Sequence, residues 1–401
     1  MKNFYFVFVF LFFISDGFCQ TSSLKEKYNS IDNIMMDVRF LSSDFLEGRE
    51  TGSKGEKLAA EYIHNRMDVL GLRVFYHEFD IIFHGQKTSS RGRNVIGYLD
   101  NNYNNTIVLG AHYDHLGYGN FGSRRPNAKT IHNGADDNAS GVALILELIK
   151  YLKKDSLKSN ILVVAFSGEE LGLLGSDAFV NEVLVDSFNI KYMMNFDMVG
   201  KLKNNKLILN GTGTSNWIEI IQKTKSRNNK NILELKEISS GVGPSDYTSF
   251  YKKDIPVLSF FTGAHDDYHT PDDDASKLNY YGIFKILLFA RSIIQEADDI
   301  NMRFIKTKNN SSSDTPKFSV TLGVMPSYSF DGEGMKIDVV IENRPASLAG
   351  IKDGDIVIKI GPYKVKDLNT YMLALSKFKK GEPADVLILR GSIKKRFKVI
   401  F

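Results

Sequence analysis

From Asn105 to Ala297 the sequence alternates short, strongly apolar runs with amphipathic helical patterns, and this alternation constrains the fold more than any other feature. The apolar runs favour strands, and the stretches between them have the 3.6-residue period of surface helices. Such alternation is typical of an α/β sheet with crossover helices. We therefore predict a mixed, mainly parallel central sheet flanked by helices. The expected strands cover 106–111, 160–166, 191–196, 206–210 and 255–261, and the expected helices cover 139–153, 170–182, 217–225 and 277–297.

Histidine and acidic residues follow several of these predicted strands directly. His112 comes after the first strand, and Asp114 follows two residues later, where a carboxylate could orient the imidazole ring. The pair Glu169 and Glu170 comes after the second strand, where a cation would relieve the crowded negative charge. Taken alone, a single histidine is more often a surface or core residue, and paired glutamates are usually solvated.

Three further segments repeat this pattern. Asp136 and Asp137 lie in an acidic turn that opens a predicted helix, although acidic residues at such a position also serve as helix caps. Asp197 follows a third apolar strand, and His265 and His269 follow the last one. A helix cap and a polar surface loop are the respective alternatives. Because open α/β sheets collect ligands at the carboxyl ends of their strands, the five segments together predict one site at one edge of the sheet.

The cysteine content restricts the chemistry of this site. Cys19 is the single cysteine in the chain. Residues 1–19 combine a short positive segment, an apolar stretch and a polar break, which predicts a secretory signal peptide cleaved between Cys19 and Gln20. Lipoprotein anchoring is the weaker interpretation because the large residue Phe18 precedes the cysteine. The mature protein would be periplasmic or secreted and free of thiols, so any metal must be bound by His, Asp and Glu side chains.

The order of these motifs resembles that of the co-catalytic di-zinc peptidases, the family of secreted bacterial leucine aminopeptidases, glutamate carboxypeptidase and glutaminyl cyclases. The similarity runs from about Val38 to Ala297 and includes Leu41–Arg49 and Thr51–Ser53, which resemble the N-terminal signature of the family. A further segment around Tyr247 is similar to one near the substrate, although the family has His or Gln where Tyr247 stands.

The resemblance implies two zinc ions bound by five residues: His112 and Asp197 for one ion, Glu170 and His269 for the other, and Asp137 as the bridge. It also implies that Glu169 is the general base and that the Asp137–Asn138 peptide is cis. Zinc suits imidazole and carboxylate ligands, and two ions that share a water lower its pKa toward neutrality. We therefore predict a secreted zinc aminopeptidase that removes N-terminal residues from peptides by a metal-bridging hydroxide, with Glu169 and Asp114 as catalytic residues.

A second domain is expected after the peptidase domain of residues 24–299. Residues 300–316 are polar, lack apolar periodicity and predict a linker. The remainder, 317–401, is β-rich, and its segments Thr321–Val324 and Arg344–Asp355 resemble a bacterial PDZ domain. In PDZ domains a Gly-containing loop binds a peptide C-terminus while the peptide adds as a strand. A module that only packs against the catalytic domain, or guards its mouth, fits the sequence equally well.

Other functions stay open within the same fold. A glutaminyl cyclase would use one zinc ion and usually lacks the first histidine, so the presence of His112 favours two metals. A metallo-carboxypeptidase would need Arg or Lys groups for the substrate's terminal carboxylate, and the sequence gives no clear cluster of them. A non-catalytic peptide-binding protein is disfavoured by the complete ligand set and by Glu169. Only Arg73–Arg91 is available for a protease-associated insertion, so none is expected.

The composition limits the partners of this chain. A net charge of +4 over 401 residues, with basic and acidic residues interleaved, gives no reason to expect nucleic acid. No segment after the leader is long and apolar enough to predict stable membrane insertion. The expected partners are peptide substrates with a free N-terminus and, at the PDZ-like domain, a peptide C-terminus.

Overall fold

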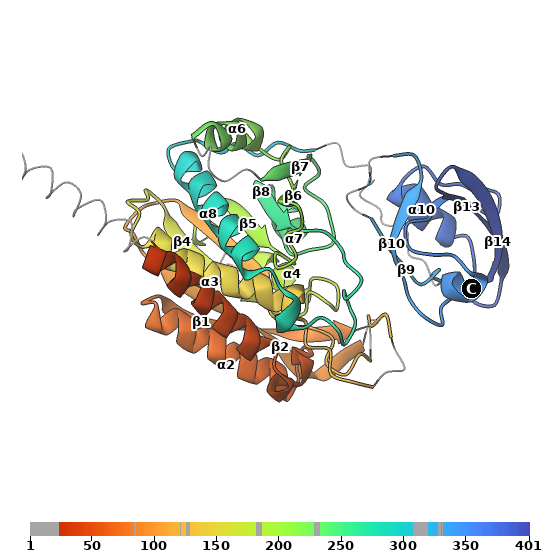
Figure 1. The fold of residues 1–401 in the computed structure, drawn as a ribbon, viewed down its shortest axis with the longest axis horizontal. Helices are drawn as coiled ribbons and strands as arrows, with labels where there is room; N and C mark the ends of the chain where they lie inside the picture. The colour runs from red at the N-terminus through yellow and green to blue at the C-terminus, as the bar shows by residue number, and fades with distance from the viewer. Residues whose placement is uncertain are drawn as a thin grey trace, which may run out of the picture.

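A computed structural model describes residues 24–83, 86–120, 122–125, 129–181, 187–227, 233–307, 320–327, 330 and 332–401. These residues form a large N-terminal α/β domain and a small β-rich C-terminal domain, the blue part of Figure 1. The predicted signal peptide, residues 1–19, lies outside the described residues. None of the helices in the described ranges combines the length and the apolar character that a bilayer-spanning helix needs.

The sheet of the N-terminal domain has eight strands in the order β1-β2-β4-β3-β5-β8-β6-β7. Its strands are β1 (Arg73–Phe83), β2 (Gln86–Leu99), β3 (Thr106–His112), β4 (Asn160–Phe166), β5 (Ile190–Phe196), β6 (Lys206–Asn210), β7 (Glu234–Ile238) and β8 (Val257–Phe261). The central strands β4, β3, β5 and β8 are parallel, whereas β2 is antiparallel to β4 and β6 is antiparallel to β8. The predicted mixed, mainly parallel sheet is confirmed.

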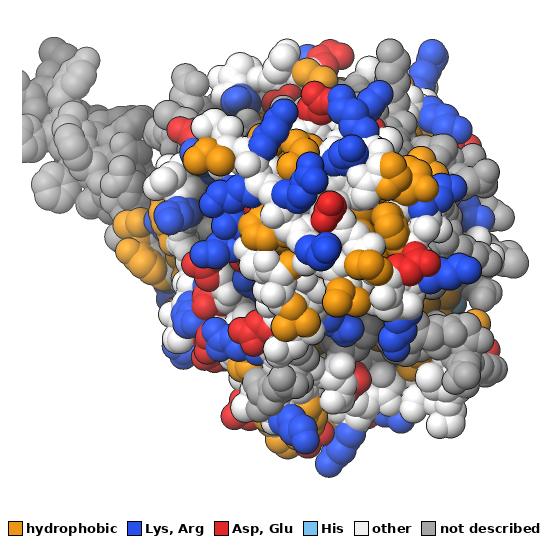
Figure 2. Space-filling view, turned by 90° about the vertical axis from the view of Figure 1, so that its right-hand side faces the viewer, with side chains coloured by type: hydrophobic (Ala, Val, Ile, Leu, Met, Phe, Trp, Pro, Cys, Tyr) orange, Lys and Arg blue, Asp and Glu red, His pale blue; other side chains and the backbone are white. Residues whose placement is uncertain are grey.

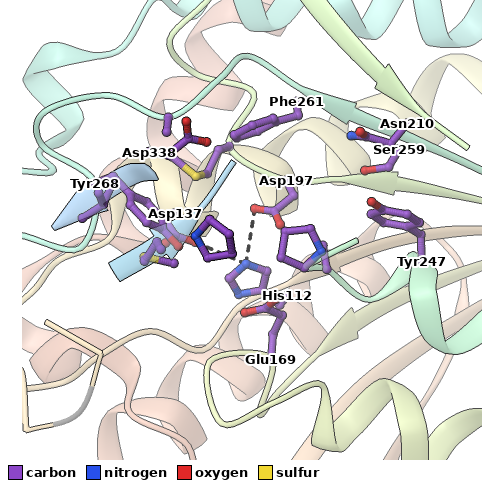
Figure 3. Close-up of a pocket in the computed structure, with 17 residues that line it drawn as sticks. His112, Asp137, Glu169, Asp197, Asn210, Tyr247, Ser259, Phe261, Tyr268 and Asp338 are labelled. Carbon is purple, nitrogen blue, oxygen red and sulfur yellow. Dashed lines mark ion pairs between the residues drawn. The ribbon is translucent and has the colours of Figure 1, made fainter. Parts of the chain in front are cut away.

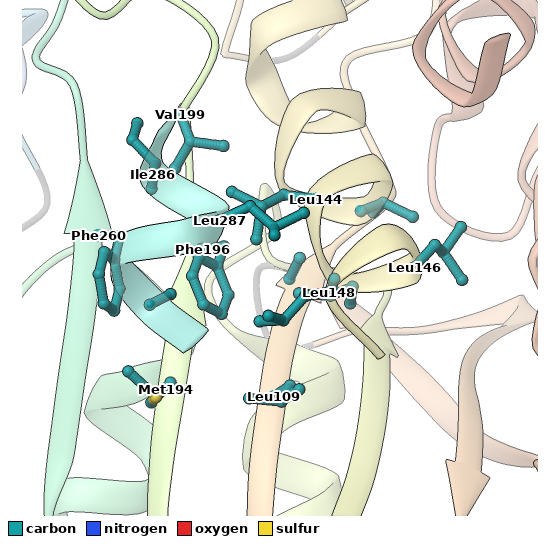
Figure 4. Packing of buried hydrophobic residues seen from close by; sticks show 14 of the residues in the cluster. Leu109, Leu144, Leu146, Leu148, Met194, Phe196, Val199, Phe260, Ile286 and Leu287 are labelled. Atoms are coloured by element: carbon teal, nitrogen blue, oxygen red, sulfur yellow. The ribbon is translucent and has the colours of Figure 1, made fainter. Parts of the chain in front are cut away.

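Helices cover both faces of this sheet (Figure 1). One face carries a helix over 24–41 together with α2 (Lys54–Val69), α3 (Gly141–Leu152), α6 (Trp217–Arg227) and α8 (Tyr280–Ala297), and the other carries α4 (Leu174–Asn181) and α7 (Tyr247–Tyr251). Strand residues alternate between the two cores, because Ile107 and Leu109 belong to the larger cluster and Val108 to the smaller one. Figure 4 shows the larger cluster, in which strand residues such as Leu109 and Phe196 pack against α3 and α8.

The structure shifts several of the expected boundaries. The helix expected over 170–182 begins at Leu174, because Gly172 and Leu173 have positive φ angles of 101° and 64° that a helix cannot contain. The last strand begins at Val257, after a proline. Strands β1 and β2 form a long antiparallel hairpin. The sequence did not predict these strands, because charged residues interrupt their apolar pattern. The part of the chain that the structure describes also contains the short helices η1 (Asp44–Arg49), η2 (Ala135–Ser140) and η3 (Ala275–Lys277).

The C-terminal domain has its own sheet and its own core. Its sheet has the order β14-β13-β11-β10-β9, with β12 paired to β11. Its elements are β9 (Val324–Pro326), β10 (Met335–Val340), α9 (Pro345–Ala349), β11 (Ile356–Ile360), β12 (Tyr363–Lys364), α10 (Leu368–Leu375), β13 (Pro383–Arg390) and β14 (Ile393–Ile400). The pairings are antiparallel, and a separate hydrophobic cluster fills the space beneath them. The first described part of the expected linker packs on the N-terminal domain, where Ile305 N–H donates to the carbonyl of Thr214 at 2.8 Å.

Candidate metal centre

Five of the sequence-predicted residues meet at the carboxyl edge of the parallel strands. His112 ends β3, and its Nε2 lies 3.2 Å from Asp137 Oδ1 and 3.4 Å from Asp197 Oδ1 (Figure 3). His269 Nε2 lies 3.1 Å from the other oxygen of Asp137 and 3.1 Å from Glu170 Oε2. The carboxylate of Asp137 therefore stands between the two histidines, one oxygen toward each. Asp137 lies in η2, whose Asp137–Asn138 peptide is cis, as the resemblance implies.

The two histidines are held so that Nε2 faces these carboxylates. Their Nδ1 atoms face carbonyl oxygens, that of Asp114 at 3.2 Å for His112 and that of Gly122 at 3.0 Å for His269. An Nδ1–H donated to a carbonyl leaves the lone pair on Nε2, which is the state that binds a metal. His269 Nε2 is buried and makes no hydrogen bond within the described residues, although two carboxylates lie within 3.1 Å of it. A cation among these atoms would explain that arrangement.

The charges in the site support the same conclusion. Burial opposes protonation of His112, yet the negative charges of Glu169 and Asp197 hold its pKa well above the usual value. Burial likewise opposes protonation of His269, and Glu170 is the main cause that raises its pKa. A buried cluster with this excess of carboxylates is stabilised by a divalent cation. Its donor set of two imidazoles and three carboxylates fits zinc. Whether these residues bind the metal stays a prediction.

Asp114 and Glu169, the two predicted catalytic residues, are linked to each other. The backbone N–H of Glu169 donates to Asp114 Oδ1 at 3.2 Å, and Thr51 Oγ1 donates to Asp114 Oδ2 at 2.9 Å. Asp114 Oδ1 also lies 3.7 Å from Nδ1 of His112. Asp114 thus holds the loop that carries Glu169 beside the imidazole. Burial raises the pKa of Glu169 well above its usual value, and neighbouring Glu170 adds to the rise while His112 opposes it.

Sequence reasoning missed the role of Arg49. Its side chain is fully buried, and it donates to the carbonyls of Tyr113 at 2.6 Å, Asn133 at 2.7 Å and Gly134 at 3.0 Å, and also to the carbonyl of Leu41. Three of these carbonyls belong to the loops that carry the metal-site residues. In the sequence, Arg49 is only part of a family signature. Its burial and its hydrogen bonds to the carbonyls of two loops become apparent only in the three-dimensional structure.

His115 was also left without a role by the sequence. Its Nδ1 lies 2.9 Å from Glu170 Oε1 and 3.8 Å from Asp137 Oδ2, so it belongs to a second cluster of possible ligands with these two residues. Asp136, in contrast, is directed away from the ligands. Its Oδ1 accepts from the N–H of Gly200 at 2.6 Å, so this carboxylate lies beside the ligands and not among them.

A pocket opens beside the metal-site residues (Figure 3). Its wall combines aromatic and apolar side chains with a few polar ones: Met198, Asn210, Pro244, Ser245, Tyr247, Ser259, Phe261, Ala264, Tyr268, Met325, Pro326, Asp338 and Val339, in addition to His112, Asp137, Glu169 and Asp197. A mostly apolar concave site with convergent polar groups is typical of a ligand pocket. Tyr247 lines it, in the place where the resemblance expected His or Gln.

Comparison with known proteins agrees with this geometry. Residues 94–292 match the sequence profile described as Peptidase family M28, and residues 300–400 match that of the PDZ domain. The N-terminal domain belongs to peptidase family M28. The predicted resemblance to the zinc aminopeptidases with a C-terminal PDZ domain is thereby confirmed, and so is the prediction of a zinc metallopeptidase.

Individual relatives of this chain are distant. Aminopeptidase YwaD of Bacillus subtilis is 27% identical over 205 residues, which cover 48% of this chain and 42% of the relative. The crystal structure of a leucine aminopeptidase precursor from Bacteroides thetaiotaomicron has a TM-score of 0.57 at 19% identity and covers 66% of this chain and 96% of the other. A glutaminyl cyclase from the same organism has a TM-score of 0.56 at 20% identity, with 66% and 97% covered. At these identities the structures show the shared fold, which hosts both activities.

Proposed function

We propose that this protein is an exported di-zinc aminopeptidase that hydrolyses the N-terminal residue from peptides. The observation that carries the proposal is the position of Asp137, whose two carboxylate oxygens lie 3.2 and 3.1 Å from Nε2 of His112 and Nε2 of His269. This arrangement offers two adjacent sites with one shared ligand. Asp197 would complete the first site and Glu170 the second.

The protein's own residues have distinct tasks in this reaction. Two bound zinc ions would polarise the scissile carbonyl and make water more acidic. Glu169 lines the pocket without lying in either ligand set, so it is free to take a proton from the attacking water and to pass it to the leaving amine. Asp114 positions both Glu169 and His112 through the contacts described above. The aromatic wall around Tyr247 and Phe261 excludes water from the substrate side chain.

His112 supports an aminopeptidase over a glutaminyl cyclase, because the first histidine usually missing in the cyclases is present here and is placed against Asp197. Export rests on residues 1–19 alone and stays a prediction. Binding of a peptide C-terminus by the PDZ domain likewise stays a prediction.

The proposal is tested with the purified mature chain. Bound zinc is counted, and hydrolysis of aminoacyl chromogenic substrates is compared with hydrolysis of N-terminally blocked analogues. We expect two zinc ions per chain and release only from free N-termini. The Glu169→Gln variant should lose about 10²- to 10⁴-fold in kcat with unchanged zinc content, while Glu61→Gln, a change at an exposed site on α2, should not alter kcat. Cleavage of blocked substrates would favour a carboxypeptidase or endopeptidase, and absence of zinc and of hydrolysis would contradict the proposal.

A further inference from the structure

Arg124 connects the PDZ domain to the loop that contains His269. The backbone N–H of Arg124 donates to the carbonyl of His269 at 2.9 Å, and its guanidinium donates to the carbonyl of Asp266 at 2.9 Å. A second guanidinium nitrogen forms an ion pair with Asp353 of the PDZ domain at 2.8 Å, and the Arg124 side chain is only 14% exposed. The N–H of Glu342 reaches the carbonyl of Arg124 at 3.4 Å. Arg124 therefore links the two domains beside the metal centre.

Two strands of the PDZ domain form part of the wall of the catalytic pocket. Met325 and Pro326 of β9 and Asp338 and Val339 of β10 line the same pocket as the metal-site residues. Figure 3 shows Asp338 across the pocket from Glu169, near Phe261. The PDZ domain, which follows the peptidase domain in sequence, thus completes the pocket.

A bulge in β10 directs these side chains toward the pocket. Ile337 pairs with Pro326, but the next pairing joins Val339 to Met325, so Asp338 is the extra residue of the strand. A β-bulge changes the direction of side chains and often lies next to an active site. Ile337 and Val340 pack in the PDZ core, whereas Val339, only 2% exposed, lines the catalytic pocket.

The carboxylate of Asp338 is partly buried among groups of both signs. Burial raises its pKa, although the Ser327 hydroxyl, Lys336 and Lys236 all act to lower it, and Asp353 adds a further negative charge nearby. The side chain is half-buried and lines the same pocket as Phe261 and Tyr268. A carboxylate in such a place gains most from a cation that enters the pocket with a ligand.

The outer face of the same domain has the opposite character. Figure 2 shows this face, on which Lys and Arg side chains gather. Strand β14 lies on this side of the molecule in Figure 1, and its residues Lys394, Lys395 and Arg396 are exposed. Positive charge along an edge strand discourages pairing with other chains. The acidic group at the pocket is therefore a local feature of the inner face and not a reflection of an acidic domain.

We propose that Asp338 is a specificity-determining residue, through which the PDZ domain selects peptides that carry a Lys or Arg side chain at the first or second position. The inference deepens the proposed aminopeptidase function and rests on it. An ammonium or guanidinium group in the pocket would form a charge-assisted hydrogen bond with Asp338, while Val339 and Met325 contact its aliphatic stem.

Turnover tests the inference with three variants of the full-length mature protein. Asp338→Asn removes the charge, Asp338→Lys inverts it, and Asp385→Asn is a matched control on β13, where the side chain is 49% exposed. Each is assayed on free tripeptides with Lys, Arg, Leu or Met at the first or the second position. We expect Asp338→Asn to lower kcat/KM for one basic series by about 10- to 100-fold, mainly through KM, with the Leu and Met series within about twofold. Asp338→Lys should favour acidic peptides, and the control should match the wild type.

Binding separates this inference from the function on which it rests. Affinities of the same peptides are measured by calorimetry in a Glu169→Gln background, with and without Asp338→Asn. A preference for basic peptides that disappears with Asp338→Asn supports the inference even if turnover is absent. Equal losses for basic and apolar peptides would mean that Asp338 only supports the fold, and unchanged affinities would mean that it does not meet the ligand; either result overturns the inference. Inactivity of the wild type on every free peptide would instead refute the aminopeptidase proposal.

Discussion

Replacing Arg49 by methionine tests whether one buried cation holds the loops of the metal centre. The guanidinium donates to four carbonyls, those of Leu41, Tyr113, Asn133 and Gly134. At roughly 1.5–3 kcal/mol for each charge-assisted hydrogen bond, these contacts contribute about 6–12 kcal/mol. Burial acts in the other direction, because it lowers the pKa of Arg49 from 12.5 to about 10, a cost of roughly 3.4 kcal/mol. The variant should therefore lose at least about 3 kcal/mol of unfolding free energy.

The single tryptophan makes this loss measurable in the peptidase domain alone. Trp217 lies in α6 and is fully buried in the larger core, so its fluorescence reports unfolding of that domain. With an m-value of about 3 kcal/mol/M in urea, the midpoint should fall by about 1 M or more. Arg39→Met, at an exposed position on the helix over 24–41, is the matched control and should leave the midpoint in place. An Arg49→Met midpoint within about 0.3 M of that control would refute the reasoning.

Two further results are expected. Burial raises the pKa of Glu56 from 4.5 to about 7, so the folded state binds more protons than the unfolded state between these values, and stability falls as the pH rises from about 4.5 to about 7. The Glu56→Gln variant should lack this decline, which amounts to at most about 3.4 kcal/mol; identical pH profiles of urea midpoints in the two proteins would contradict this. Chelation of zinc should lower the Tm reported by Trp217, and added zinc should restore it, because a metal at about 1,000 times its Kd contributes roughly 4 kcal/mol; an unchanged Tm would argue against a metal in this domain.

The sequence predicts the central sheet and also predicts that the site residues lie together at one edge of it. Buried parallel strands are apolar along their whole length, as in 106–111 and 160–166, so they stand out from the surrounding chain. Strands that run in parallel bring their carboxyl ends to one edge, and polar residues after those ends must meet there. The edge hairpin of β1 and β2 carries no such signal, because its two strands are partly exposed and rich in charge.

Other parts of the site depend on contacts that no local pattern contains. From the sequence, Arg49 would be expected at the surface, because arginine is rarely buried. Its hydrogen-bond acceptors are backbone carbonyls, which every residue has, so no sequence pattern identifies them. The attachment of the PDZ domain rests on Arg124 and Asp353, which are ordinary charged residues in sequence. Asp338 lies in a bulge, and a bulge interrupts the period-2 pattern by which a strand residue is assigned to one face.

The contribution of β9 and β10 to the pocket has a consequence for how the protein is made. Domains fold as units. The metal-site residues, from His112 to His269, belong to the N-terminal domain, whereas residues 324–340 belong to the C-terminal one. A chain in which only the first domain has folded would therefore have its ligand set in place and a pocket open on one side. Closing that side requires the second domain to fold and to dock, which is a step separate from assembly of the ligands.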